Sequence, residues 1–252
     1  MNELIRDWST RYHPVSLEEL DQVRLMDRVE TKFVLNLNRL PQVLQEMESG
    51  YRILDTAATR IHTYKTVYFD TPALKLYQLH HQGKLNRYKI RFRKYCNSEL
   101  SFFEIKFKNN RGRTIKKRIL QRNCETIIDG KAKALIKVRT PFDPDSLAPV
   151  LEIRYDRMTF VNRDFTERIT LDTGLTFRKG SEEYAIPDLC IAEVKQERSE
   201  PAGFPCLMHR IHVQPLSVSK FCLGIIHLYP EIRKNNFKPK LLYIQKILKN
   251  VN

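Results

Sequence analysis

Hydrophobic and polar residues alternate with a period of two along much of this chain, as they do in the strands of an antiparallel sheet. The alternation predicts strands at residues 28–35, 64–69, 86–95, 100–108, 113–120, 150–160, 167–171 and 190–197. Between two of these strands, the run Asn109-Asn110-Arg111-Gly112 has the composition of a hairpin turn. The pattern therefore predicts a β-rich fold.

Helical spacing occurs at fewer places. Ser16 and Glu19 have the spacing of a capping box, which predicts a short helix that ends near Met26. Asn38 is predicted to cap a second helix that runs through Glu48. Other segments expected outside the sheet are a helical or loop excursion at 123–138 and helices at 220–227 and 240–249. Without an internal repeat or a linker, residues 1–252 are expected to form a single α+β domain.

One predicted strand carries a row of cations on a single face. Successive side chains of a strand point to opposite faces, and in residues 86–95 the set on one face is Arg87, Lys89, Arg91 and Arg93. The plain interpretation is the solvated face of an ordinary antiparallel sheet. Four cations in line would repel one another unless an anion lies over them. The alternative is a closed barrel with these charges inside, which would form a basic tunnel with helices packed outside.

Composition supports a polyanionic partner. Lys and Arg number 44 against 29 Asp and Glu, a formal net charge of +15. Nucleic acid, an acidic membrane face and a phosphate-rich small molecule all fit that excess. Nucleic-acid recognition usually adds exposed aromatic residues for base stacking. Here the aromatic residues of the strands alternate onto the face opposite the cations, which favours bare phosphate over nucleic acid.

Several other classes of protein are disfavoured. The five cysteines contain no C-x-x-C pair, which argues against a disulfide framework or a zinc ribbon and predicts a cytoplasmic location. No stretch approaches the roughly 20 apolar residues of a membrane span. No P-loop and no G-x-S-x-G elbow is present. His209 and His212 lack a nearby carboxylate, so they are interpreted as surface residues.

A series of short motifs, in order along the chain, resembles a known family. They are Arg28-Val29-Glu30-Thr31-Lys32-Phe33, Val67-Tyr68-Phe69-Asp70-Thr71, Lys89-Ile90-Arg91-Phe92-Arg93, Phe103-Glu104-Ile105-Lys106, Tyr155-Asp156-Arg157, Arg168-Ile169-Thr170-Leu171-Asp172, Ala192-Glu193-Val194-Lys195 and Ser219-Lys220-Phe221. Together they resemble the VTC (vacuolar transporter chaperone) polyphosphate polymerase domain, a relative of the CYTH phosphohydrolases among the triphosphate tunnel metalloenzymes. The likeness covers about residues 20–228 and implies a closed antiparallel tunnel with basic walls.

The resemblance also implies roles for individual residues. Those that match the catalytic cations of the family are Lys32, Arg91, Arg93, Lys106, Arg157 and Lys220. Substrate-binding roles are implied for Lys89, Lys108, Tyr155, Arg168, Lys195 and Ser219. Glu193 matches a carboxylate that binds Mn²⁺ or Mg²⁺. The implied reaction transfers the terminal phosphoryl group of a nucleoside triphosphate to a growing polyphosphate chain.

Two other functions remain open: a triphosphate or polyphosphate hydrolase on the same fold, and a polyphosphate-binding module without catalysis. The related hydrolases have the sequence E-x-E-x-K, whereas Arg28 stands at the first acidic position here. A base at that position disfavours a second metal ion and a metal-activated water.

Four residues allow two interpretations each. Tyr155 and Arg157 share their strand parity with Leu151 and Ile153, so periodicity alone allows the packing face, whereas the resemblance implies the tunnel face. Asp172 is predicted either to orient Arg168 or to form a surface ion pair. Glu104 is predicted to be a second metal ligand or the ion-pair partner of Lys106.

Overall fold

The computed structural model describes residues 2–21, 28–98, 100–121, 126–197 and 203–249. The strands are β1 (Pro14–Val15), β2 (Arg28–Asn36), β3 (Tyr51–Leu54), β4 (His62–Asp70), β5 (Arg87–Tyr95), β6 (Ser101–Lys108), β7 (Thr114–Leu120), β8 (Ala148–Asn162), β9 (Glu167–Lys179), β10 (Glu182–Ile186) and β11 (Leu189–Glu197). The α-helices are α1 (Asn2–Thr10), α2 (Leu17–Asp21), α3 (Leu40–Met47), α4 (Lys75–His81), α5 (Gly130–Arg139), α6 (Gly203–Arg210), α7 (Lys220–Leu228) and α8 (Lys238–Lys249).

The long strands follow the predicted alternation. Each predicted strand is present, and the hairpin between β6 and β7 closes with a hydrogen bond from the backbone N–H of Asn109 to the carbonyl of Arg113 (3.0 Å). β9 continues beyond its predicted end at residue 171, because Gly174 adopts a positive φ of 61° and lets the chain resume as a strand. The short strands β1, β3 and β10 were not predicted, since two to five residues give too little alternation to detect.

Of the two predicted helix caps, one is confirmed. The capping box is present, because Ser16 Oγ accepts from the Glu19 N–H (3.1 Å) and Glu19 accepts from the Ser16 N–H (2.8 Å). The last part of that predicted helix, residues 22–26, lies outside the described residues, as does the start of the 123–138 segment, within which α5 forms. The predicted cap at Asn38 is wrong: the Asn36 carboxamide accepts from the Asn38 N–H (3.0 Å) and starts a 3-10 turn that leads into α3. The helices α1, α4 and α6 were not predicted.

The predicted closure of the sheet into a barrel is not confirmed. The strand order is β2-β11-β9-β8-β4-β5-β6-β7, and β2 and β7 end the ladder without pairing to each other in the described part of the chain. The outer edge of β2 is occupied by another segment, since Leu216 donates its N–H to the Lys32 carbonyl (2.8 Å). The edge strand β7 carries Lys116, Lys117 and Arg118, and charges of this kind discourage strand addition.

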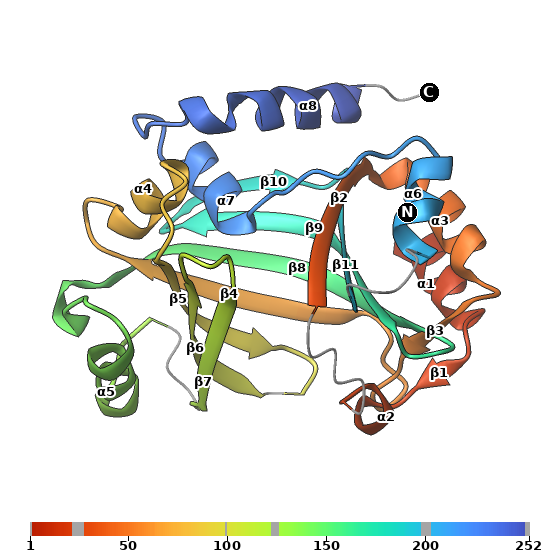
Figure 1. Cartoon of the computed structure of the whole chain (residues 1–252), viewed down its shortest axis with the longest axis horizontal. Helices are drawn as coiled ribbons and strands as arrows, with labels where there is room; N and C mark the ends of the chain where they lie inside the picture. Colours follow the sequence, from red (N-terminus) through yellow and green to blue (C-terminus); the bar gives the residue numbers. More distant parts are fainter. Residues whose placement is uncertain (1, 22–27, 99, 122–125, 198–202, 250–252) are drawn as a thin grey trace.

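The two faces of the sheet pack against different helices. On one face, apolar side chains pack against α1, α3 and α6, and a second cluster packs around α5. Figure 1 shows the first three helices grouped at one end of the sheet and α5 at the other. On the opposite face, α7 covers an apolar area that includes Leu151, Ile153 and Phe177. The rest of that face carries charged residues, and we call it the channel face.

α7 lies unusually close to the sheet. A Cβ on Gly224 would come within 2.6 Å of side-chain atoms of Leu151 and Phe177, so only glycine allows this approach. At the start of the helix, Ser219 Oγ accepts from the Cys222 N–H (3.3 Å) as the N-cap. The packing thus places Ser219 and Lys220 where the apolar part of the channel face meets its charged part.

No helix in the described ranges combines the length and the apolar content that a membrane crossing needs. The described cysteines, Cys96, Cys190, Cys206 and Cys222, are free thiols.

Candidate functional site

The predicted site residues share the channel face. Strand alternation and register place Lys32 (β2), Lys89, Arg91 and Arg93 (β5), Lys106 and Lys108 (β6), Tyr155 and Arg157 (β8), Arg168 (β9), and Glu193 and Lys195 (β11) on this face, with Ser219 and Lys220 at the start of α7. Tyr155 and Arg157 do share a face with Leu151 and Ile153. The packing face and the tunnel face are therefore the same face of the sheet, and α7 covers only its apolar part.

Three lysines stand directly opposite one another across β5, β6 and β7. Lys106 pairs in register with Lys89 on one side and with Lys116 on the other. Like charges in such positions destabilise a sheet. Two of the three find partners: Lys89 donates to Ser219 Oγ (2.9 Å), and Lys116 donates to Glu104 (2.9 Å). Lys106 stays between them.

Glu104 neutralises one guanidinium. Its carboxylate is fully buried and accepts from Arg91 through Nε (2.8 Å) and Nη2 (2.6 Å). Burial alone would raise the pKa of Glu104, but the charges of Arg91, Arg93 and Lys116 hold it well below its usual range. The predicted ion pair between Glu104 and Lys106 is therefore wrong, since Arg91 and Lys116 take both carboxylate oxygens.

Asp172 neutralises a second pair of cations. It is buried and accepts two hydrogen bonds from Arg157 (2.5 and 2.7 Å) and one from Lys220 (2.5 Å). Burial raises the pKa of Asp172, but Arg157 and Lys220 outweigh it and lower the pKa below the usual value. Both predicted roles of Asp172 are wrong: it does not orient Arg168, and its ion pairs are not at the surface. Asp172 instead ties β8 and β9 to the start of α7.

Lys106 and Arg93 have no acidic partner among the described residues. The charge of Arg91 acts first to hold the pKa of Lys106 well below its usual range, followed by burial and by Arg93 and Lys195. Arg93 contacts only neutral groups, through Nη2 to Tyr155 Oη (3.0 Å) and Nε to Thr66 Oγ1 (3.4 Å). Part of the positive charge of the channel face therefore has no carboxylate against it within the described residues: at these two side chains, and also at Lys89, which donates to the neutral Ser219 hydroxyl group.

Contacts between residues of distant strands show that the sheet is curved. Lys195 lies on β11 and Lys106 on β6, far apart in the strand order, yet their charges interact. At the start of α7, Ser219 contacts Lys89 of β5 while Lys220 contacts Asp172 of β9. The sheet is therefore curved enough to bring its two halves to face each other, although β2 and β7 do not pair within the described residues.

Glu193 lies between two lysines. One carboxylate oxygen pairs with Lys32 and the other with Lys195 (2.8 Å). Burial would raise the pKa of Glu193, but Lys195, Lys32 and Arg157 hold it well below its usual range, so the group is ionised. Within the described ranges no group of three or more His, Cys, Asp or Glu residues is placed to hold a metal ion. The Glu193 carboxylate is a hard oxygen ligand of the kind that Mn²⁺ or Mg²⁺ accepts.

Sequence patterns missed four residues of the site: Tyr64, Tyr68, Lys116 and Arg118. Lys116 and Arg118 do alternate with the apolar residues Ile115 and Ile119, and that signal could have identified them. The two tyrosines carry no charge, so only the register of β4 against β5 places them beside the cations. The expectation that aromatic side chains lie opposite the cations holds for Tyr88, Phe92, Phe103 and Phe107. It is wrong for Tyr95 and Phe102 and for the tyrosines of β4 and β8, which share the face of the cations.

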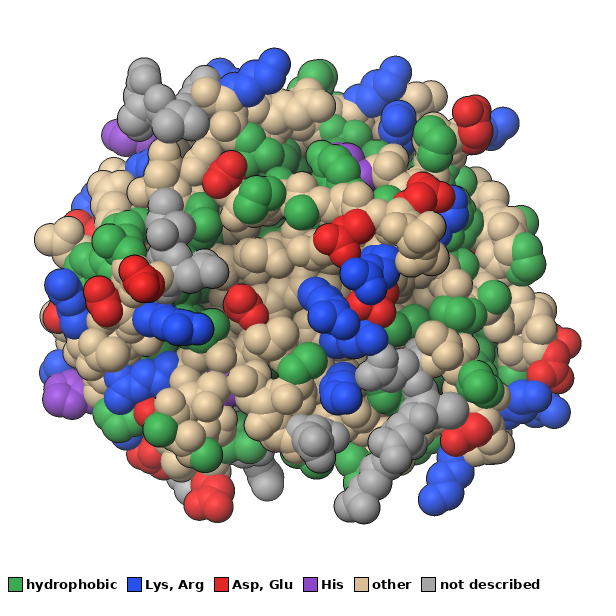
Figure 2. Space-filling view, turned by 180° about the vertical axis from the view of Figure 1, so that it is seen from behind, with side chains coloured by type: hydrophobic (Ala, Val, Ile, Leu, Met, Phe, Trp, Pro, Cys, Tyr) green, Lys and Arg blue, Asp and Glu red, His purple; other side chains and the backbone are tan. Residues whose placement is uncertain are grey.

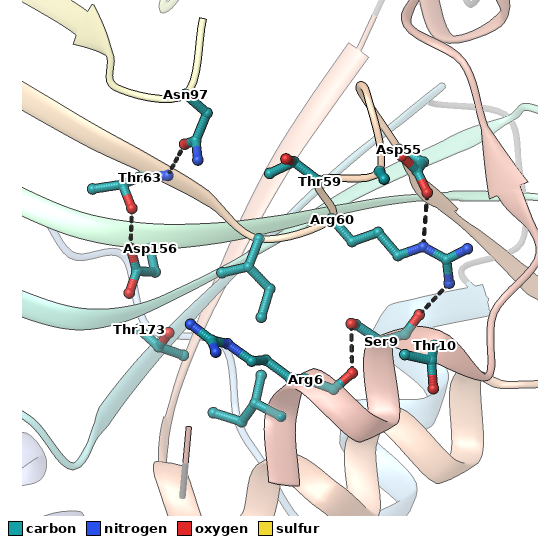
Figure 3. A pocket seen from close by; sticks show the side chains of 13 residues that line it. Arg6, Ser9, Thr10, Asp55, Thr59, Arg60, Thr63, Asn97, Asp156 and Thr173 are labelled. Carbon is teal, nitrogen blue, oxygen red and sulfur yellow. Dashed lines mark hydrogen bonds and ion pairs between the residues drawn. The ribbon is translucent and has the colours of Figure 1, made fainter. Parts of the chain in front are cut away.

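A separate cavity lies between α1 and the strands β4, β8 and β9, outside the channel face. It has a volume of about 630 Å³, and its lining includes Arg6, Arg60, Asp55 and Asp156 (Figure 3). The cavity therefore holds both signs of charge, and Arg60 is already engaged by Asp55 (2.9 Å). Figure 2 likewise shows basic and acidic side chains next to one another over the face viewed from behind. The channel face differs because part of its positive charge has no acidic partner.

Comparison with known proteins identifies the family of this chain. Residues 27–229 match the family model described as the VTC domain. The chain belongs to the VTC domain family. No curated protein matches this VTC domain. Membership indicates a function on triphosphate or polyphosphate chains.

Solved structures similar to this VTC domain include two cyclase candidates. One, from Hippeastrum, has a dominant triphosphatase activity and is 14% identical, with a TM-score of 0.49, over 79% of this chain and 95% of that one. The other, from Vibrio parahaemolyticus, is 14% identical with a TM-score of 0.48, over 79% of this chain and 98% of that one. The PH1819 protein from Pyrococcus horikoshii is 12% identical with a TM-score of 0.42, over 77% and 97%.

The Asp172→Asn variant tests the buried ion pairs. Asp172 has a lowered pKa in the folded VTC domain, so its stabilisation is fully present above the unfolded pKa near 4 and is lost as the pH falls through the folded value. At pH 7 the variant removes the anionic partner of two partly buried cations, and its free energy of unfolding should fall by about 3 kcal/mol. The difference from wild type should narrow below pH 4, as measured by urea denaturation between pH 3 and pH 7.

The control is Asp145→Asn, since Asp145 pairs with Lys133 at the surface and is 65% exposed. That change should leave the free energy of unfolding close to that of wild type, because exposed ion pairs contribute little to stability. A gap between Asp172→Asn and wild type that stays constant down to pH 3 would contradict the assignment.

Proposed function

We propose that this VTC domain is a polyphosphate polymerase that uses a nucleoside triphosphate. The observation that carries the proposal is that Arg93 and Lys106, on adjacent strands, have no acidic partner among the described residues. They lie on a curved face with Lys32, Lys89 and Lys195. An anion with several charges placed along a chain would relieve their mutual repulsion. A polyphosphate or triphosphate chain has that distribution of charge.

The proposed reaction needs no nucleophile from the protein. A terminal oxygen of the polyphosphate chain attacks the terminal phosphorus of the nucleoside triphosphate. The bond from that phosphorus to its bridging oxygen breaks, and the nucleoside diphosphate leaves with the electron pair. The chain becomes one phosphate longer. The main barrier is repulsion between the two anionic reactants, which positioned cations reduce.

The cations divide into two groups by their partners. Arg91 and Arg157 are each fixed by two hydrogen bonds to a buried carboxylate, so they offer a fixed direction with part of their charge compensated. Arg93 has no carboxylate partner among the described residues, and a phosphate placed over Lys106 would favour the protonated form of this lysine against the neighbouring cations. We expect the reacting phosphates to lie over these four residues with Lys32 and Lys220. Binding roles are proposed for Lys89, Lys108, Tyr155, Arg168, Lys195 and Ser219.

Glu193 is the proposed ligand for Mn²⁺ or Mg²⁺. Its two oxygens are held by Lys32 and Lys195, and one carboxylate is too few ligands for a site made by protein alone. The residues therefore fit an ion that arrives with the phosphates of the substrate. When bound, such an ion would neutralise phosphate charge.

Incubation of the purified protein with ATP and Mn²⁺ should yield ADP together with long polyphosphate, because the channel face offers cations for an anionic acceptor. Gel electrophoresis for the polymer and a phosphate assay on the same samples measure both products. Little free phosphate is expected. ADP that appears in step with free phosphate, with no polymer even when a short polyphosphate primer is present, would exclude the polymerase and favour a hydrolase.

The Glu193→Gln variant should separate binding from turnover. The change removes the proposed metal ligand but no cation, so the affinity for tripolyphosphate should stay within about threefold while turnover with Mn²⁺ falls at least a hundredfold. Isothermal titration and the polymer assay measure the two effects. Glu183→Gln is the control, since Glu183 pairs with Arg178 outside the proposed site and is 48% exposed, and it should keep most of the activity. Unchanged turnover in Glu193→Gln, or an affinity that falls as far as turnover, would exclude the metal-binding role.

A further inference from the structure

Tyr64 lies on β4 between two of the proposed phosphate-binding arginines. The guanidinium carbon of Arg157 is 5.0 Å from the centre of the Tyr64 ring, and that of Arg93 is 5.4 Å from it. Both distances are within the range of cation–π contacts. One buried ring therefore contacts Arg157, which pairs with Asp172, and Arg93, which has no acidic partner among the described residues.

The ring is itself fixed by other aromatic residues. Tyr64 stacks on Tyr155 with 5.3 Å between the ring centres and 9° between the planes, and Tyr95 packs against it at 4.9 Å. The ammonium group of Lys220 lies 4.8 Å from the centre of the Tyr155 ring. The two stacked rings thus form one surface that three cations of the site contact.

The ring surface differs from the carboxylates in what it does to charge. Glu104 and Asp172 fix Arg91 and Arg157 but also neutralise them. A neutral ring attracts a guanidinium through its quadrupole and leaves its net charge intact. Burial raises the pKa of the Tyr64 phenol, against the charges of Arg157 and Arg93, so this ring stays neutral. Within the described part of the chain, the groups that contact Arg93 are therefore all neutral: the Tyr64 ring, Tyr155 Oη and Thr66 Oγ1.

We propose that Tyr64 is a positioning residue whose ring face orients Arg93 and Arg157 toward phosphate without neutralising either of them. The inference rests on the proposed function of the channel face. The ring rather than the hydroxyl group carries the effect, because no hydrogen bond of the Tyr64 hydroxyl is found within the described residues. A phenylalanine at this position should therefore work nearly as well.

A series of fluorinated phenylalanines at position 64 tests this proposal. Fluorine changes the size of the ring little but weakens its quadrupole, so each added fluorine should weaken the cation contacts. We expect tripolyphosphate to bind Tyr64→Phe within about twofold of wild type. Affinity should fall stepwise through the monofluoro and difluoro rings to a loss of roughly tenfold with trifluorophenylalanine, as measured by isothermal titration.

Tyr88 provides a matched control. It lies on the same strand as Arg93 but on the opposite face, where it stacks on Phe107 at 4.6 Å. The same fluorinated residues at position 88 should leave tripolyphosphate affinity unchanged. Thermal melting of every variant checks that the fold is kept, and Tyr64→Leu adds an apolar side chain without a ring, for which a similar tenfold loss is expected.

The outcomes separate this inference from the proposed function. If the wild-type protein does not bind tripolyphosphate, the proposed function fails. If wild type binds but affinity does not change with fluorination at position 64, the role of the Tyr64 ring is excluded while the channel face stands. A large loss in Tyr64→Phe would also overturn the inference, because it would assign the effect to the hydroxyl group.

Discussion

Repulsion among cations on one face of a curved sheet is the constraint on which the rest of the structure depends. Lys106 stands in register between Lys89 and Lys116, and the charge of Lys195 reaches it from the other half of the sheet. Such an arrangement is stable only if most of the charge is compensated. Buried Glu104 and Asp172 compensate part of it, and both have lowered pKa values as a result.

The positive charge that no carboxylate compensates gives the site its chemistry. Carboxylates fix Arg91 and Arg157, whereas rings and hydroxyl groups fix Arg93. Lys106 has no such anchor among the described side chains. The start of α7 joins the two halves of the channel face, which the strand ladder leaves unjoined, and Gly224 lets the helix approach closely enough to do so.

Alternation in the sequence predicts the long strands, and therefore the common face of the basic residues, because period-two parity is a local property. Family resemblance adds the residues of β8, where parity alone leaves Tyr155 and Arg157 ambiguous. Partner choice was not predictable: Asp172 pairs with Arg157 and Lys220 rather than Arg168, and this depends on strand register and on where α7 lies. Closure of the barrel was predicted but is not confirmed for the same reason, because pairing of the two end strands depends on the whole sheet.

A crystal structure with a non-hydrolysable triphosphate analogue and Mn²⁺ tests the central claim most directly. The account predicts phosphate oxygens within hydrogen-bond distance of Arg93 and Lys106, with Arg91 still paired to Glu104 and Arg157 still paired to Asp172. An analogue bound instead in the cavity lined by Arg6 and Arg60, with no phosphate on the channel face, would contradict it.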